Sequence, residues 1–82
     1  MWFTYIIQCK DNSFYTGITS DLQRRFQEHK EGKGGKYTSS HKVLKLMFSE
    51  SFTTKGEALK REIQLKGWSH QKKENLIRAM PV

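Results

Sequence analysis

The sequence predicts an α/β domain of the α+β type: a three-stranded antiparallel sheet flanked by helices, in the order β-β-α-(loop)-β-α-α. Runs of β-branched and aromatic residues at 2–9 and 14–18 flank a polar turn, and a third such run covers 43–50. Helical patterns with capping signals follow the second and third runs. A chain this short buries roughly 60–65% of its unfolded surface, so we expect a single domain, 1–82, with a small core.

The register of the first hairpin decides where its two tyrosines lie. Turn-forming residues occupy positions 11–12. A two-residue loop there puts Tyr5 and Tyr15 on opposite faces of the sheet. A three-residue loop, 11–13, pairs Cys9 with Tyr15 and puts both tyrosines on one face, because a shift of one residue turns every side chain over. A site that uses both tyrosines therefore needs a loop of odd length.

Capping signals predict where the helices begin and end. Ser20 opens a capping box at the start of a helix that covers 21–30 and ends at Gly32. Thr54 opens a second capping box, and the helix that follows it ends at Gly67. A last helix follows, with a serine cap and three apolar packing residues: Ser69, Leu76, Ile77 and Met80.

The first helix carries ionisable residues on its inward face. Leu22 and Phe26 mark the apolar side of this helix. At about 100° per residue, Arg25 lies about 60° from Leu22, and His29 lies about 20° from it. Charged groups on a buried stripe cost free energy unless they are paired, and such a placement is often functional. Arg25 and His29 are therefore candidate site residues.

The second predicted helix has a carboxylate in the same kind of position. Its apolar arc consists of four residues: Ala58, Leu59, Ile63 and Leu65. Glu62 falls inside this arc, about 60° from Leu59 and about 40° from Ala58. An ion pair with Lys66 four residues later, or a partnership with Arg25 across the core, would explain Glu62 without a function. A functional carboxylate at the rim of a cleft is the alternative.

Taken together, these features resemble the GIY-YIG nuclease domain. The matching features are the Tyr5-Ile6-Ile7 strand, the Tyr15-Thr16-Gly17 strand, Arg25, His29 and Glu62. The first triplet reads Phe3-Thr4-Tyr5 rather than Gly-Ile-Tyr, and Thr16 stands where the second motif has isoleucine. The resemblance covers nearly the whole chain and is nearest to the small stand-alone bacterial members of that family.

The resemblance implies hydrolysis of DNA phosphodiester bonds with one metal ion, Mg²⁺ or Mn²⁺. It assigns Tyr5 as the general base for water, Tyr15 as its support and Glu62 as the metal ligand. Mg²⁺ is commonly held by one or two carboxylates plus substrate phosphate, so a single glutamate is sufficient in principle. Arg25 offers a planar fork to a phosphate, and His29 could exchange a proton near neutral pH.

The excess of positive charge predicts a polyanionic partner. Fifteen Lys and Arg against 8 Asp and Glu give a net charge of +7, and nucleic acid is the commonest polyanion. The glycine-rich basic loop at 32–41 suits phosphate contact, although a solvated linker with its tyrosine packed on the core fits equally well. By resemblance Asn75 is a further candidate, whose role stays open. Candidate nucleic-acid contacts are Gly17, Lys33, Lys36, Tyr37 and Lys66.

Cysteine usage and hydropathy indicate the compartment. Cys9 is the only cysteine, so no internal disulfide forms, which fits a reducing compartment. The sequence has no apolar run long enough for a membrane span. We therefore expect a cytoplasmic monomer without a membrane partner, and a protein partner that activates it stays open.

Three functions fit this sequence. The first is a structure-selective, metal-dependent endonuclease for branched, nicked or distorted DNA, because the chain is too small to carry a separate DNA-reading module. The alternative is a basic module that binds DNA or RNA with weak or no catalysis. The third is a small RNA-binding or ribosome-associated protein. The ionisable residues on inward helix faces favour the first, whereas a closed, buried ion pair between Arg25 and Glu62 would favour the third.

Overall fold

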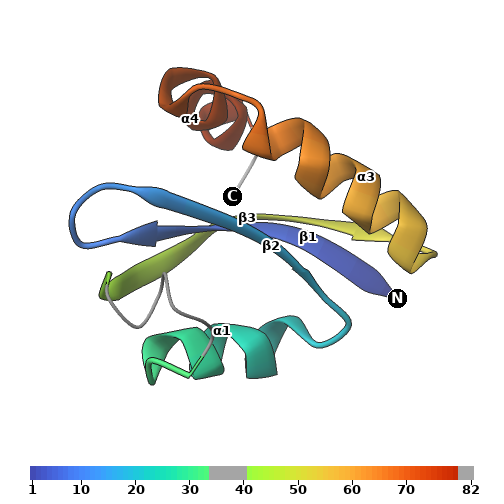
Figure 1. Ribbon diagram of the computed structural model, residues 1–82, viewed down its shortest axis with the longest axis horizontal. Helices are drawn as coiled ribbons and strands as arrows, with labels where there is room; N and C mark the ends of the chain where they lie inside the picture. The colour runs from blue at the N-terminus through green and yellow to red at the C-terminus, as the bar shows by residue number, and fades with distance from the viewer. Residues whose placement is uncertain (34–40, 80–82) are drawn as a thin grey trace.

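A computed structural model of the chain describes residues 1–33 and 41–79. Its elements are β1 (Trp2–Cys9), β2 (Phe14–Thr19), α1 (Leu22–Lys30), β3 (Val43–Phe52), α3 (Lys55–Lys66) and α4 (His70–Ala79). The strands form one antiparallel sheet in the order β2-β1-β3, with α1 on one face and α3 and α4 on the other (Figure 1). The predicted fold class and element order are confirmed. Across the described ranges, every helix is too short and too polar to span a bilayer.

The central strand β1 is buried on both sides because helices cover both faces of the sheet. Thr4 points toward α3, where its Oγ1 donates a hydrogen bond of 2.7 Å to the carbonyl of Ala58. Ile6 points the same way and packs with Leu65 in the hydrophobic core. Tyr5 lies between them in the strand and points toward α1. The alternation of side chains along β1 therefore places Tyr5 under the first helix.

The hairpin between β1 and β2 has the odd-length loop that a shared tyrosine face requires. Tyr5 lies opposite Gly17, so Tyr15, two residues before Gly17, shares its face. The predicted pairing of Cys9 with Tyr15 is wrong, since the Cys9 N–H donates to the Ser13 carbonyl at 2.9 Å and the loop lies one residue earlier. Asn12 adopts a left-handed conformation with φ of 70°, which asparagine tolerates and which closes such a three-residue loop.

The first helix begins one residue later than predicted. Asp21, not Ser20, is the N-cap, and its side chain accepts a hydrogen bond from the Arg24 N–H at 3.2 Å. The Asp21 N–H itself donates to the Thr19 hydroxyl at 3.1 Å, and this contact holds the chain in the extended conformation before the helix. Both serine and aspartate are good caps, so local sequence could not choose between them. The helix ends at Lys30, and Gly32 follows with φ of 78°.

The later helices begin where the sequence predicts. Thr54 and Glu57 form the predicted capping box at the start of α3. Gly67 ends this helix, but with φ of −80°, so no left-handed conformation requires glycine there. The hydroxyl of Ser69 accepts a hydrogen bond from the Lys72 N–H at 3.1 Å and caps α4. Met80, expected to pack from this helix, lies outside the described residues.

The buried stripe of α3 is narrower than the predicted apolar arc. Ala58 and Leu65 are fully buried, but Leu59 is 40% exposed and Ile63 is 63% exposed. The prediction that Leu59 and Ile63 pack inward is therefore wrong. The sheet has only three strands, so α3 packs on a narrow surface. Ala58 and Leu65, which lie two helical turns apart on one side of the helix, reach that surface.

Candidate active site

Tyr5 and His29 form the buried centre of the site. The Tyr5 hydroxyl and His29 Nε2 lie 2.8 Å apart and share a hydrogen bond. The two side chains come from β1 and α1, and they are only 2% and 1% exposed. Because His29 lies on the α1 face that meets the sheet, its predicted inward placement is confirmed.

Tyr15 completes a cluster of three rings on the α1 face of the sheet. Its ring centroid lies 6.4 Å from that of Tyr5 and 5.0 Å from that of His29. Tyr15 is half-buried, so it lies between the buried Tyr5–His29 pair and the surface. The structure therefore brings together both tyrosines and the histidine, as the odd-length loop predicts.

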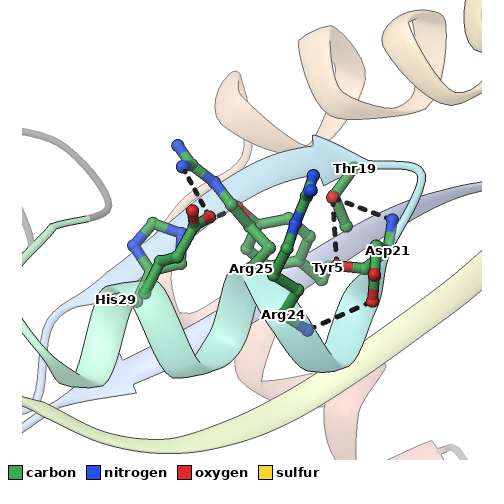
Figure 2. A network of polar contacts seen from close by, with 7 residues as sticks. Tyr5, Thr19, Asp21, Arg24, Arg25 and His29 are labelled. Carbon is green, nitrogen blue, oxygen red and sulfur yellow. Dashed lines mark hydrogen bonds and ion pairs between the residues drawn. The ribbon is translucent and has the colours of Figure 1, made fainter.

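Arg25 lies at the rim of this cluster, with its side chain 33% exposed (Figure 2). Its Nη1 lies 3.4 Å from Oε1 of Glu28, one helical turn later. Arg25 also lowers the pKa of the Tyr5 phenol, through a hydrogen bond and through its positive charge. Sequence reasoning missed Glu28, although its spacing of three residues from Arg25 is the signal that predicts such a pair.

Burial sets the protonation of the two central groups. Desolvation raises the pKa of Tyr5 to about 12, and Arg25 only partly opposes this effect. Desolvation and then the positive charge of Arg25 lower the pKa of His29 to about 4. Both groups are therefore neutral at pH 7, and the hydrogen bond between them joins a phenol to an uncharged imidazole.

Gly17 is required by the packing of Tyr5. A Cβ atom at position 17 would lie 2.6 Å from the Tyr5 hydroxyl and 3.2 Å from Cε1 of Tyr15. Gly17 is a predicted nucleic-acid contact, and the space left by its missing side chain is taken up by the Tyr5 phenol. Gly17 therefore makes room for Tyr5 and fixes the position of its ring.

Glu62 does not face the tyrosines directly. The inward faces of α1 and α3 do not meet, because the two helices cover opposite faces of the sheet (Figure 1). Ala58 and Leu65 face the sheet, and the helical period places Arg61 and Glu62 on opposite sides of that line. Arg61 bonds Glu50 of β3 at 3.0 Å, so Glu62 lies on the side of α3 away from that contact. The negative charge of Glu62 is near enough to Tyr5 to raise the pKa of its phenol. The neighbouring strand β2 is an edge strand of the sheet.

The structure gives Arg25 and Glu62 separate partners. Glu62 pairs with Lys66 at 3.5 Å, and its side chain is 14% exposed, whereas Arg25 pairs with Glu28. The closed, buried Arg25–Glu62 pair that would favour a purely structural interpretation is therefore not formed. Both observed pairs are short-range contacts within one helix.

The donor set at Glu62 limits which metals could bind there. Within residues 1–33 and 41–79, no group of three or more His, Cys, Asp or Glu side chains could hold a metal. A single carboxylate excludes a zinc-type cage but suits Mg²⁺ or Mn²⁺, which keep several water ligands and also bind substrate phosphate. Glu62 is therefore compatible with a metal that binds together with the substrate.

The expected nucleic-acid contacts are only partly described. The Lys33 side chain is 75% exposed, with Glu31 at 4.0 Å, and Lys66 is engaged with Glu62. Lys36 and Tyr37 lie outside the described residues. Asn75 is exposed on α4, and its Oδ1 accepts a hydrogen bond of 3.0 Å from Gln71.

Most of the chain matches a known nuclease family. The family model described as the GIY-YIG catalytic domain matches residues 1–75. The chain therefore belongs to the GIY-YIG family, a nuclease family that acts on nucleic acid and is generally metal-dependent.

The relatives are small single-domain bacterial proteins named UPF0213. The chain is 47% identical to one from Staphylococcus saprophyticus over 75 residues, which is 92% of each protein. It is also 47% identical to the UPF0213 protein YazA of Bacillus subtilis, over 92% of this chain and 76% of that one. The solution structure of a UPF0213 protein from Bacillus halodurans is similar, with a TM-score of 0.60, 42% identity and coverage of 95% of this chain and 84% of that one.

Proposed function

We propose that this protein is a metal-dependent endonuclease that hydrolyses phosphodiester bonds in branched, nicked or otherwise distorted DNA. The observation that carries the proposal is the buried Tyr5–His29 hydrogen bond with Arg25 at its rim. Apolar residues could fill this part of the small core, so stability alone does not explain a buried neutral phenol bonded to a neutral imidazole. The same pair beside an arginine suits proton transfer next to a bound phosphate.

The cluster supports a specific proton path. Arg25 binds the scissile phosphate through its guanidinium fork. The Tyr5 oxygen takes the proton of the attacking water while its own proton passes to His29 Nε2, 2.8 Å away. A bound phosphate offsets the charge of Arg25, which is one cause of the lowered His29 pKa, so substrate binding makes His29 a stronger base.

Glu62 is the residue that would hold the metal. When bound, Mg²⁺ polarises the phosphate and stabilises the leaving oxygen. Lys66 neutralises Glu62 in the absence of a metal, and its ammonium is free to move to a substrate phosphate once the carboxylate is engaged. Lys66 is therefore the partner of the Glu62 carboxylate before metal and substrate bind.

The test is cleavage of labelled single-stranded, duplex, flap and four-way-branched DNA with Mg²⁺, with Mn²⁺ and with excess chelator. Wild type should cleave a branched substrate only when metal is present. Glu62→Gln should lower the rate about 100-fold or more, since a metal supplies several kcal/mol of charge stabilisation. Glu74→Gln is the matched control, because Glu74 is also paired with a basic residue on its own helix, at 2.6 Å.

The same assay tests the proton path. Tyr5→Phe keeps the ring but removes the hydroxyl, and it should slow cleavage by about 10²–10⁴-fold while DNA binding is retained. Cleavage that survives chelator, or that is equal in Glu62→Gln and Glu74→Gln, would contradict the proposal.

A binding module without turnover is the second candidate. The Glu62–Lys66 ion pair favours it, because this pair occupies the only proposed metal ligand. That candidate predicts salt-sensitive binding of DNA or RNA and no cleavage under any metal condition.

A further inference from the structure

We propose that Arg24 binds a second substrate phosphate, adjacent to the one held by Arg25. The inference rests on the proposed function and extends it to how the substrate strand is positioned. Its starting point is the pairing of the four arginines in the chain. Three of them form ion pairs at 4.0 Å or less: Arg25 with Glu28, Arg61 with Glu50 and Arg78 with Glu74.

Arg24 differs from these three. Over the described ranges, no carboxylate forms an ion pair with its guanidinium. The backbone N–H of Arg24 is held by the Asp21 cap at 3.2 Å, so its position is set while its side chain is exposed. In Figure 2 the Arg24 and Arg25 side chains extend from α1 in the same general direction, toward β2. An exposed arginine beside the proposed catalytic arginine is therefore available to a ligand.

Helix stability does not explain a cation at this position. Arg24 lies in the first turn of α1, where aligned peptide dipoles give a positive end. The Asp21 carboxylate caps this end through the Arg24 N–H and forms no ion pair with the Arg24 guanidinium. A basic side chain is unfavourable there and would be favourable in the last turn. A phosphate reverses this balance, because it pairs with the guanidinium and also interacts favourably with the positive end of the helix.

The spacing suits consecutive phosphates of one strand. Phosphates follow one another every ~3.4 Å along the axis of each DNA strand. Arg24 and Arg25 are neighbours on α1, and their side chains extend in the same general direction, so their guanidinium groups can reach two neighbouring phosphates of one strand (Figure 2). Such a contact fixes the strand in register without reading its sequence. Arg24 is thus a positioning residue for the strand that Arg25 presents to Tyr5.

The experiment measures DNA binding without cleavage. Fluorescence anisotropy with a labelled four-way-branched DNA, in excess chelator, is recorded over a range of salt concentrations for wild type, Arg24→Gln, Arg24→Lys and Arg78→Gln. Arg24→Gln should reduce the slope of log K against log salt by about 0.9, the contribution of one phosphate contact. Arg24→Lys should keep the wild-type slope, since it keeps the charge. Arg78→Gln removes an arginine from α4, on the other side of the sheet from α1, and should leave the slope unchanged.

Cleavage kinetics with metal provide a second measurement. Arg24→Gln should raise KM by the same factor as the dissociation constant and leave kcat within about twofold, since the residue acts on strand binding. Equal slopes for Arg24→Gln and Arg78→Gln, or a fall in kcat with unchanged KM, would overturn the inference. If wild type binds but never cleaves, the nuclease proposal fails while the slope still decides on Arg24. A folded wild type that binds no DNA would overturn both.

Discussion

His29 is a buried base whose charged form the folded protein disfavours. Its pKa is lowered from 6.5 to about 4 by desolvation and by the charge of Arg25. The unfolded chain therefore takes up this proton at a higher pH than the folded protein does. The stability that neutral His29 contributes is fully present above pH 6.5 and is lost as the pH falls through about 4.

We expect wild type to lose up to roughly 3 kcal/mol of unfolding free energy on acidification, because one pKa unit corresponds to about 1.4 kcal/mol. Urea unfolding at about pH 7.5 and about pH 4.5 measures this loss. His29→Gln should show a smaller pH dependence than wild type. His70→Gln, which changes an exposed histidine, should behave like wild type. Equal pH dependence in both variants would contradict the buried neutral state of His29.

Each element of this fold tolerates a side chain only where its neighbours leave room. In β2, the backbone of Gly17 lies under the Tyr5 ring, and an added Cβ would meet the hydroxyl at 2.6 Å. In α3, nothing lies within 4 Å of a Cβ added at Gly56. The same substitution should therefore have opposite effects in the two elements.

Gly17→Ala should destabilise the protein by about 1–3 kcal/mol and displace Tyr5, because the ring must move to admit the methyl group. Gly56→Ala should stabilise it by up to about 1 kcal/mol, because alanine is the better helix former. Thermal unfolding monitored by circular dichroism measures both changes. Shifts of the same sign in the two variants would show that the close approach of Tyr5 and Gly17 is not maintained in solution.

At the scale of the whole molecule, a net charge of +7 on 82 residues governs association. If about three phosphates are contacted, the affinity for DNA should fall about 40-fold between roughly 50 and 200 mM salt. Because phosphate contacts carry no sequence information, branched DNAs of equal structure and scrambled sequence should bind equally. Titrations followed by anisotropy measure both properties. Salt-independent binding, or a strong preference for one sequence, would contradict this account of recognition.

The sequence by itself determined which residues share a face within one element. The period of a helix turned His29 inward. The α3 capping box at Thr54 is also local, because its partners lie three residues apart. These features follow from φ, ψ geometry and neighbouring side chains, so a sequence pattern is sufficient to predict them. The sequence left the length of the hairpin loop open, and the odd-length loop of the structure puts Tyr5 and Tyr15 on one face.

Only the tertiary structure decided which faces meet. It placed Glu62 and His29 on helices that cover opposite sides of the sheet, and it left Ile63 at the surface. It also brought the Tyr5 hydroxyl within 2.8 Å of His29, a contact between residues 24 positions apart. Such contacts depend on strand order and helix docking, which are set by burial summed over the whole chain and which no local pattern specifies.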